Sequence, residues 1–445
     1  MKRSLFSTLL LLALPLLLCA QSRGSYFFEN SLLRHKLNPA FAPQVRYVSV
    51  PVLGSTSVDA ASNIGLGNFI FQYRNKSYPF LSEQIDAKTF LNKLPRRDPY
   101  VAERIETDLL GGGMPVGESG YATVSLSLVE SGSLTVPNSL LRFAKLGRTA
   151  DTEAWDIEGL QGRLYGYASL AAGYSHDLDW LVEGLRVGAR AKLLVGITAA
   201  QARIDRISVR MEEDLFAVNT LGSGKLSGFG YDAADNRFSW RGFGLRGLGT
   251  AIDLGAEYGL PLDGFFEGIN FSASVTDLGF IWFNRRLKQV STDASFAFSG
   301  FDDLGDGISE QVAALTDELQ GLVRPEVSDG RGFVQTLTPS IHVGADAPFY
   351  VLAFRMHAGL LYYRTVGHDN LMASYGISPF EWLNLGLNWT FLGPTGRFGF
   401  YAEYIPKKYV SVFFGMERAG YRRNSDHLAI RNFTDSFAFG INVLL

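Results

Sequence analysis

The stretch "LNLGLNWTF" at residues 383–391 alternates apolar side chains with small or polar ones without interruption. Successive side chains of an extended chain point to opposite sides, so this stretch has one apolar and one polar face. A period of two predicts a β-strand. The apolar face carries Leu383, Leu385, Leu387, Trp389 and Phe391, and the other face carries Asn384, Gly386, Asn388 and Thr390.

The same alternation recurs at residues 185–197, 250–260, 268–279 and, at the end of the chain, 437–445. A soluble sandwich would bury the apolar faces of such strands against a second sheet, whereas a membrane barrel would turn them to lipid. Strands of soluble proteins average about five or six residues, and about ten residues are needed to cross a bilayer. Because these stretches commonly reach ten residues or more, the pattern favours the barrel.

Charged residues such as Arg190, Lys192, Asp253 and Glu257 fall on the polar faces, where a wet lumen accepts them. We therefore predict an all-β fold over residues 45–445, a transmembrane antiparallel β-barrel of about 14 strands, in which the last strand pairs with the first. Strands of ~10 residues use only about a third of the chain, so taller strands, loops and short helical insertions must account for the rest. The charged side chains predicted to face the lumen are Arg186, Arg190, Lys192, Asp253 and Glu257.

Helical insertions are predicted in three places. Residues 138–146 have Asn138 as a candidate N-cap and Gly147 as a stop signal. Residues 306–322 place apolar side chains on one helical face, and residues 80–94 show a weaker pattern of the same kind. Each is interpreted as a loop helix packed over a barrel end, with a gate or a partner-docking surface as the alternative.

The N-terminal residues 1–20 have the features of a signal peptide: two basic residues, an apolar run over 9–18, and small residues before Gln21. Lipidation at Cys19 is the alternative, but the position before it holds Leu18 rather than a small residue. Secretion together with the barrel pattern predicts the cell outer membrane as the location, with membrane lipid as a partner.

Without the leader, 39 basic and 44 acidic residues leave a net charge of −5, which gives no indication of nucleic-acid binding. The one cysteine is lost with the leader, and this excludes disulfides, thiol catalysis and cysteine metal sites. The 48 glycines, 33 phenylalanines and 19 tyrosines are many for a soluble enzyme and suit an outer-membrane barrel.

Motifs that carry chemistry are absent from the sequence. "GFGLRG" at residues 242–247 has the spacing of a dinucleotide loop, but such a loop must open a helix, and this one leads into the alternating stretch 250–260. It therefore favours a tight turn or a bend. No nucleophile with its base and no metal-ligand pair is recognisable. We predict no catalytic residue, no metal site and no cofactor, and hence no enzyme.

The segment "LNPAFAP" at residues 37–43 precedes the first alternating stretch. Pro39 fixes its own φ and disfavours helix at Asn38, so the pair predicts a turn. Two interpretations stay open. The turn either leads plainly into the first strand, or belongs to a plug, residues 21–44, that holds one rigid shape in the barrel mouth.

These stretches resemble known families. "LNPAFAP" resembles the Asn-Pro-Ala motif in the hatch of the FadL-like long-chain fatty acid transporters. "LRVGARAKLLVGI", "TAIDLGAEYGL" and "SVTDLGFIWF" are similar to strands of a Bacteroidota outer-membrane family of unknown function, itself similar to FadL-like barrels and to the PorV and PorP barrels. The resemblance implies a fourteen-stranded barrel with an N-terminal hatch. By carry-over, Asn38, Pro39 and Ala40 would be hatch residues that gate a ligand.

Two functions compete. The first is passage of a small hydrophobic molecule through a hatch-gated lumen. The alternative is a non-enzymatic structural or accessory barrel of a type IX secretion, gliding or surface-attachment complex, with protein partners from that machine. The resemblance to the hatch motif favours transport, and the long polar insertions favour the accessory barrel.

Overall fold

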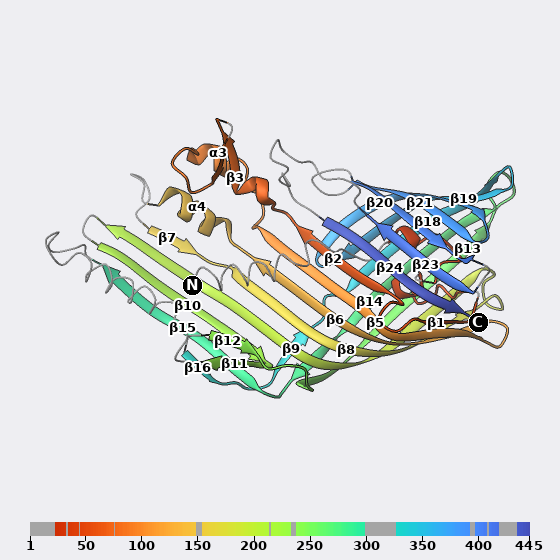
Figure 1. The fold of residues 1–445 in the computed structure, drawn as a ribbon, viewed down its shortest axis with the longest axis horizontal. Coiled ribbons are helices and arrows are strands. Elements are labelled where there is room, and N and C mark those ends of the chain that lie inside the picture. Colours follow the sequence, from red (N-terminus) through yellow and green to blue (C-terminus); the bar gives the residue numbers. More distant parts are fainter. Residues whose placement is uncertain are drawn as a thin grey trace.

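The computed structural model describes residues 23–445, apart from residues 33, 44, 75, 148–153, 213–214, 233–236, 299–325, 392–396, 407–408 and 418–433. Figure 1 shows a barrel at one end of the molecule and a long sheet that extends from it. The predicted signal peptide and the predicted helix at 306–322 lie outside the described residues.

Fourteen strand positions close into an antiparallel ring within the described part of the chain, as predicted. The last strand pairs with the first, with Leu444 opposite Tyr47, so the ring leaves no open edge. In order round the ring the strands are β1 (Tyr47–Ser49) together with β2 (Thr56–Ser62), β5 (Tyr100–Val116), β6 (Gly120–Thr135), β8 (Leu160–Asp177), β9 (Leu185–Glu212), β13 (Gly247–Pro261), β14 (Gly268–Phe283), β18 (Ser340–Val351), β19 (Phe354–Thr365), β20 (His368–Phe380), β21 (Leu383–Thr390), β22 (Arg397–Tyr404), β23 (Val410–Met416) and β24 (Thr434–Leu444).

The quoted stretch 383–391 forms β21 and shows how the strands are oriented. Leu385, Leu387 and Trp389 are exposed, whereas Asn384 and Asn388 on the opposite face are buried. The apolar face therefore points outward, and the polar face points into the barrel. A sandwich would show the reverse, so the burial pattern supports a barrel that meets lipid.

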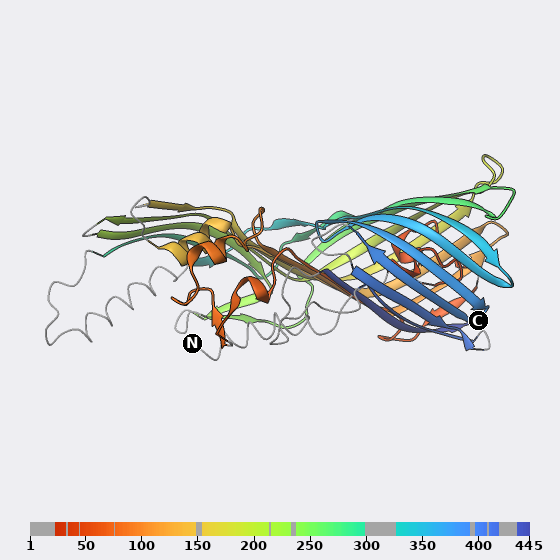
Figure 2. The same ribbon diagram turned by 90° about the horizontal axis from the view of Figure 1, so that it is seen from above.

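The sheet of the ring continues beyond it as an open extension, here called the extended sheet (Figures 1 and 2). The 28-residue β9 passes out of the ring and pairs there with β7 and β10. At ~3.3 Å per residue it is about 90 Å long, far more than the ~25 Å apolar band of a barrel requires. The added strands are β7 (Ala154–Ile157), β10 (Leu215–Ser227), β15 (Leu287–Phe298) and β16 (Glu326–Asp329), while β17 (Phe333–Thr336) pairs with the end of β14.

A small lobe packs beside the extended sheet. Its core consists of Ile64, Phe71, Ile85, Phe90 and Leu141. The elements are η3 (Leu66–Asn68), β3 (Ile70–Tyr73), β4 (Lys76–Pro79), α3 (Ala87–Leu91) and α4 (Asn138–Leu146), and a separate hairpin is formed by β11 (Phe229–Asp232) and β12 (Arg237–Trp240).

Two of the three predicted helices lie among the described residues, one as predicted and one shorter. The helix at 138–146 is present as α4, although Pro137 rather than Asn138 occupies the N-cap. Within 80–94 only the five residues of α3 are helical, because the Asp86 side chain accepts a hydrogen bond from the Thr89 amide and starts the helix there. Among the described residues, no helix is both long and apolar enough to cross a membrane.

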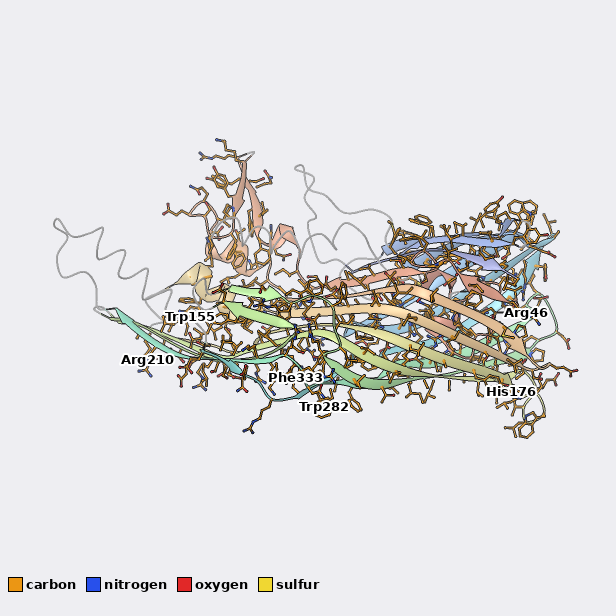
Figure 3. All side chains as sticks on the ribbon, turned by 60° about the horizontal axis from the view of Figure 1, so that its bottom comes forward. Arg46, Trp155, His176, Arg210, Trp282 and Phe333 are labelled. Carbon is orange, nitrogen blue, oxygen red and sulfur yellow. The ribbon has the colours of Figure 1, made fainter. Side chains whose placement is uncertain are left out.

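The two ends of the barrel differ. The end that holds the C-terminus, here called the turn end, has short connections such as residues 117–119 and 352–353. The opposite end, the loop end, has long connections such as residues 63–99 and carries the extended sheet. Figure 3 places Arg46 and His176 at the turn end, Trp282 and Phe333 where the barrel meets the extended sheet, and Trp155 and Arg210 farther out along that sheet.

Candidate functional site in the barrel lumen

Residues 23–43, here called the lumen segment, run inside the barrel ahead of β1 (Figure 2). The segment contains two short helices, η2 (Arg23–Ser25) and α2 (Arg34–Leu37). Most of its described side chains are buried. A barrel of eight strands is filled by its own side chains, but one of fourteen encloses a wider lumen. The lumen segment occupies part of that space.

The Asn38-Pro39 turn is fixed by hydrogen bonds to itself and to the wall. The Asn38 Oδ1 accepts a hydrogen bond from the Ala40 amide at 3.0 Å, which closes an Asx turn. The Asn38 Nδ2 donates to the carbonyls of Ala256 on β13 and Ala273 on β14, at 3.1 and 3.4 Å. All three residues of the predicted hatch motif, Asn38, Pro39 and Ala40, are buried.

Two glycines of the wall make room for this turn. A Cβ at Gly255 on β13 would overlap the Asn38 side chain, and a Cβ at Gly188 on β9 would overlap the Pro39 carbonyl. The wall positions opposite the turn therefore accept no side chain without a shift. This close approach explains why glycine stands on the polar face of both strands.

The N-terminal end of the lumen segment is anchored by Arg23. Its guanidinium donates to Asp59 on β2 at 2.9 and 3.2 Å and to Glu417, just after β23, at 3.1 Å. It also lies 4.5 Å from the ring centroid of Tyr363 on β19. Burial of a cation is costly unless it is paired, and these two carboxylates provide the pairing.

Buried ion pairs continue from the lumen segment into the wall. Lys36 contacts Asp108 and Glu106 on β5 at 2.7 and 3.1 Å. The chain of pairs then runs from Glu106 to Arg104, and from Arg104 to Asp277 on β14 at 2.9 Å. Lys192 joins Asp277 to Asp253, and Arg190 lies 3.5 Å from Asp253. These eight side chains, at most 19% exposed, comprise four cations and four carboxylates.

The ion-pair chain crosses the lumen. β5 and β14 are separated in the ring by β6, β8, β9 and β13, yet Arg104 and Asp277 touch. Asp277 lies within a bulge in the pairing of β13 with β14 and has a left-handed backbone, φ 60°. A bulge re-aims side chains, which here brings the Asp277 carboxylate to Lys192 and Arg104.

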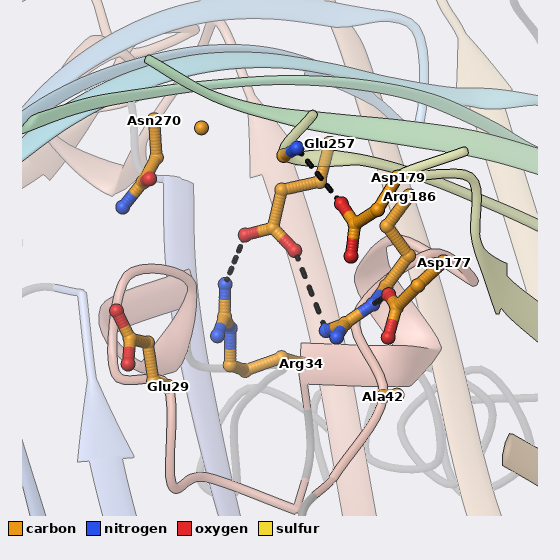
Figure 4. A pocket seen from close by; sticks show the side chains of 10 residues that line it. Glu29, Arg34, Ala42, Asp177, Asp179, Arg186, Glu257 and Asn270 are labelled. Atoms are coloured by element: carbon orange, nitrogen blue, oxygen red, sulfur yellow. Dashed lines mark hydrogen bonds and ion pairs between the residues drawn. The ribbon is translucent and has the colours of Figure 1, made fainter. Parts of the chain in front are cut away.

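Three of the predicted lumen-facing residues, Arg190, Lys192 and Asp253, thus belong to this chain of ion pairs. The other two, Arg186 and Glu257, line a polar cavity of about 320 Å³ at the turn end (Figure 4). Glu257 bridges Arg34 of the lumen segment at 3.1 Å and Arg186 at 3.9 Å. Arg186 also pairs with Asp177.

The opposite part of the lumen, against β18–β22, is lined mainly by aromatic and apolar side chains, with buried polar groups such as His357 among them. Tyr26 and Phe27 of the lumen segment pack with Leu361, Tyr363 and Met372 of the wall. Phe28 packs against Tyr401, at 5.4 Å between ring centroids, and against His357 at 4.5 Å. The lumen therefore has a charged side and an aromatic side.

A row of glycines on four consecutive strands accommodates these rings. A Cβ on Gly344 would lie 2.9 Å from the Tyr26 ring, and one on Gly359 would lie 2.8 Å from the Phe27 ring. Cβ atoms on Gly376 and Gly386 would lie 2.6 and 2.9 Å from the Phe28 ring. The aromatic side of the wall is thus shaped to the run Tyr26-Phe27-Phe28.

A second cavity of about 310 Å³ lies between the lumen segment and the barrel seam at the turn end. Apolar side chains of Leu32, Val45, Ile405 and Leu444 contribute to its lining. Both cavities therefore border the lumen segment.

Burial sets the protonation of the segment's own titratable groups. Burial lowers the pKa of His35 to about 3, and the nearby Arg190 cation lowers it further in the same direction. The neutral ring donates from Nδ1 to the Leu32 carbonyl and accepts at Nε2 from the Tyr47 hydroxyl at 3.0 Å. Although burial alone would lower the pKa of Lys36, Asp108 and Glu106 raise it above its ordinary value.

Sequence patterns did not identify several residues of this site. Tyr26, Phe27 and Phe28 are consecutive and show no period, and their partners lie hundreds of residues away. Arg104 and Asp108 on β5 share the inward parity of Glu106, so a period-two reading of that stretch could have found them. Asp277 on β14 has the parity of the apolar face, and only the bulge turns it inward. In the residues described, no group of three or more His, Cys, Asp or Glu side chains could hold a metal ion.

The ring, its outward apolar face and the internal segment define a closed antiparallel barrel of the kind that crosses membranes with strands. The chain belongs to the family described as "Family of unknown function (DUF5723)", whose profile matches residues 39–416. The predicted membership of a family of unknown function is thereby confirmed. The assignment to Bacteroidota and the likeness to PorV and PorP stay predictions.

Three solved barrels are similar in shape. They are the translocator domain of the autotransporter NalP from Neisseria meningitidis (11% identity, 90% of this chain and 88% of that chain, TM-score 0.31), the TodX deltaS2S3 mutant monoaromatic hydrocarbon channel (10%, 91% and 91%, 0.39) and the Pseudomonas putida toluene transporter TodX (8%, 96% and 94%, 0.33). Likenesses this remote say nothing about cargo or mechanism. The comparison with curated proteins finds no match.

Proposed function

We propose that this protein is an outer-membrane barrel whose lumen segment is a hatch, and that a small hydrophobic molecule passes when the hatch moves. The outward apolar face supports a lipid environment. Exposed aromatic side chains at the turn end, such as Trp180, Phe265 and Trp382, suit one membrane interface, and Trp282 and Trp389 suit the other. Barrels of this kind have short periplasmic turns and long outer loops, so the turn end faces the periplasm.

The observation that carries the proposal is the filling of the aromatic side of the lumen. Tyr26, Phe27 and Phe28 occupy a space whose wall combines apolar side chains and four glycines with a few polar side chains such as His357. An apolar molecule of similar size would find the same contacts once these rings withdraw. The charged side offers no such path, because its ion pairs fill it and would have to be broken.

The hatch is also separable from the barrel. The ring closes through β24, β1 and β5, and the lumen segment contributes no strand to it. Its contacts with the wall are side-chain packing, hydrogen bonds and ion pairs. The segment can therefore move without opening the ring.

Deletion of residues 22–42 tests this function. Cells that express the deletion variant should take up the apolar dye 1-N-phenylnaphthylamine faster than cells with the intact protein. Heat-modifiable mobility on gels confirms that the shortened barrel has folded. A folded deletion variant with unchanged dye uptake would contradict hatch-gated passage.

The extended sheet favours a second function, that of an accessory barrel in a secretion, gliding or attachment machine. β9 is far longer than a membrane requires, and β10 and β15 pair beside it outside the ring. Leu221 and Arg206 on this sheet are exposed. Native mass spectrometry after gentle extraction distinguishes the two functions. Protein partners in fixed stoichiometry would support the accessory barrel, and a barrel that carries one apolar molecule would support transport.

A further inference from the structure

The aromatic side of the lumen contains polar atoms that bond to nothing among the described residues. The Oγ of Ser374 on β20 and both the Oδ1 and the Nδ2 of Asn388 on β21 are buried and have no hydrogen-bond partner. The two residues are 4% and 2% exposed. Buried polar atoms almost always have a partner, because an unmade hydrogen bond costs the full desolvation of the group.

Ser374 and Asn388 form one cluster. They are direct cross-strand partners, so their Cβ atoms are about 5 Å apart on the inner face. On the other side of β20, Ser374 lies opposite Gly359, which accommodates the Phe27 ring. One inward position along the strands, Gly376 and Gly386 accommodate the Phe28 ring.

Two histidines extend the cluster along the wall. The Nε2 of His357 on β19 and the Nε2 of His342 on β18 are also buried without a partner. The ring of His357 meets Phe28, and the ring of His342 stacks on Tyr26 at 5.9 Å. The polar atoms without a partner therefore lie where the rings of Tyr26, Phe27 and Phe28 pack against the wall.

We propose that the aromatic side of the lumen binds an amphiphile with an aromatic or other apolar body and one uncharged hydrogen-bonding group, such as a hydroxyl, carbonyl or amide. The body takes the space of Phe27 and Phe28, and the polar group bonds to Asn388 and Ser374. An amide and a hydroxyl can both donate and accept, but they provide no positive charge, and the nearby Asp346 carboxyl beyond Gly359 adds none, so an anionic group would be buried without a partner. This inference rests on the proposed function and adds the class of molecule.

The test uses the full-length protein with Phe28→Ala, which opens the space, in detergent micelles. Three probes share one ring system: 2-naphthol is uncharged and polar, naphthalene is apolar, and 2-naphthoate is charged. We expect 2-naphthol to bind most tightly by fluorescence titration. Adding Asn388→Leu should weaken 2-naphthol about tenfold, the effect of one lost hydrogen bond, and leave naphthalene unchanged.

Matched variants keep the result interpretable. Ser374→Ala should weaken 2-naphthol in the same direction, while Ser169→Ala, a buried serine on the far wall strand β8, should not change it. Heat-modifiable mobility reports folding of each variant. If Asn388→Leu fails to fold, Ser374→Ala alone decides between the outcomes.

The outcomes separate this inference from the proposed function. A different outcome is that 2-naphthol and naphthalene bind equally and Asn388→Leu changes neither affinity. In that case water bonds to the polar atoms of Ser374 and Asn388, and this inference is wrong. Hydrophobic passage through the lumen would still stand. If none of the probes binds the Phe28→Ala protein, the aromatic side is not a ligand path. Both the proposed function and this inference then fail.

Discussion

At the scale of single residues, Asn38 holds the turn of the lumen segment to two wall strands through its carboxamide. The isosteric change Asn38→Asp removes both donors and sets a carboxylate against the Ala256 and Ala273 carbonyls. The loss should be about 1–3 kcal/mol of docking free energy. Trypsin cleavage after Arg34 and Lys36 should therefore become at least about fivefold faster.

The control for this change is Asn92→Asp at the end of α3, in the small lobe beside the extended sheet, where an asparagine is changed in the same way. It should leave cleavage within the lumen segment unaffected. Equal protection of the segment in Asn38→Asp and wild type would show that the turn does not hold the segment in place.

His35 makes docking of the lumen segment sensitive to pH. Its docked pKa is about 3, whereas a released histidine titrates near 6.5. Between these values the released segment binds a proton that the docked one does not, so docking weakens as the pH falls. From pH 6.5 to pH 5 the loss is about 2 kcal/mol, at roughly 1.4 kcal/mol per unit.

Hydrogen exchange of peptides from residues 26–41, corrected for intrinsic rates, measures this effect. Protection should decrease between pH 6.5 and pH 5 in the wild type and stay nearly level in His35→Gln. The pKa of Glu29 is lowered by Arg355, so Glu29 would weaken docking in the same direction at lower pH. The same slope in both proteins would rule out His35 as its origin.

At the scale of elements, the ion-pair chain joins the lumen segment to β5, β9, β13 and β14. Lys36→Met leaves Asp108 buried without its closest cation. Breaking a buried pair from one side costs about 3–5 kcal/mol, whereas an exposed pair contributes about 0–1 kcal/mol. Lys36→Met should therefore lower the temperature of heat modification by several degrees. The exposed-pair control Arg206→Met should leave it unchanged, and equal shifts in the two variants would contradict the account.

The strands were predictable because alternation is a local property of the sequence. Three of the stretches form ring strands with the apolar face outward and the polar face toward the lumen, as expected: residues 383–391, 250–260 and 268–279. The extended sheet was harder to predict. Residues 185–197 indicated one strand, but β9 continues to Glu212, past a bulge and over positions where Arg203 and Arg206 break the pattern of apolar faces.

The lumen contacts could be predicted only in part. The polar faces identified Arg190, Lys192 and Asp253, because their spacing of two is visible in the sequence. Nothing local relates Lys36 to Asp108 or Phe28 to Gly386, because these contacts exist only after the ring has closed. Asn388 was assigned to the polar face of its strand, but its lack of a partner is a property of the whole lumen.

At the scale of the whole molecule, the lumen is divided lengthwise. One side, along β5 to β14, is filled by compensating charges that cross from wall to wall. The other, along β18 to β22, is filled by the aromatic run of the lumen segment. This division is the central claim of the account, since it provides a path for an apolar molecule that avoids the ion pairs.

Uptake of 1-N-phenylnaphthylamine by cells that express Phe27→Ala/Phe28→Ala tests this claim most directly. The double variant removes two aromatic rings and keeps every ion pair and the Asn38 turn. Phe71→Ala in the core of the small lobe serves as the control. We predict uptake several-fold above wild type for the double variant alone. Uptake at the wild-type rate by a folded double variant would contradict an apolar path along β18 to β22.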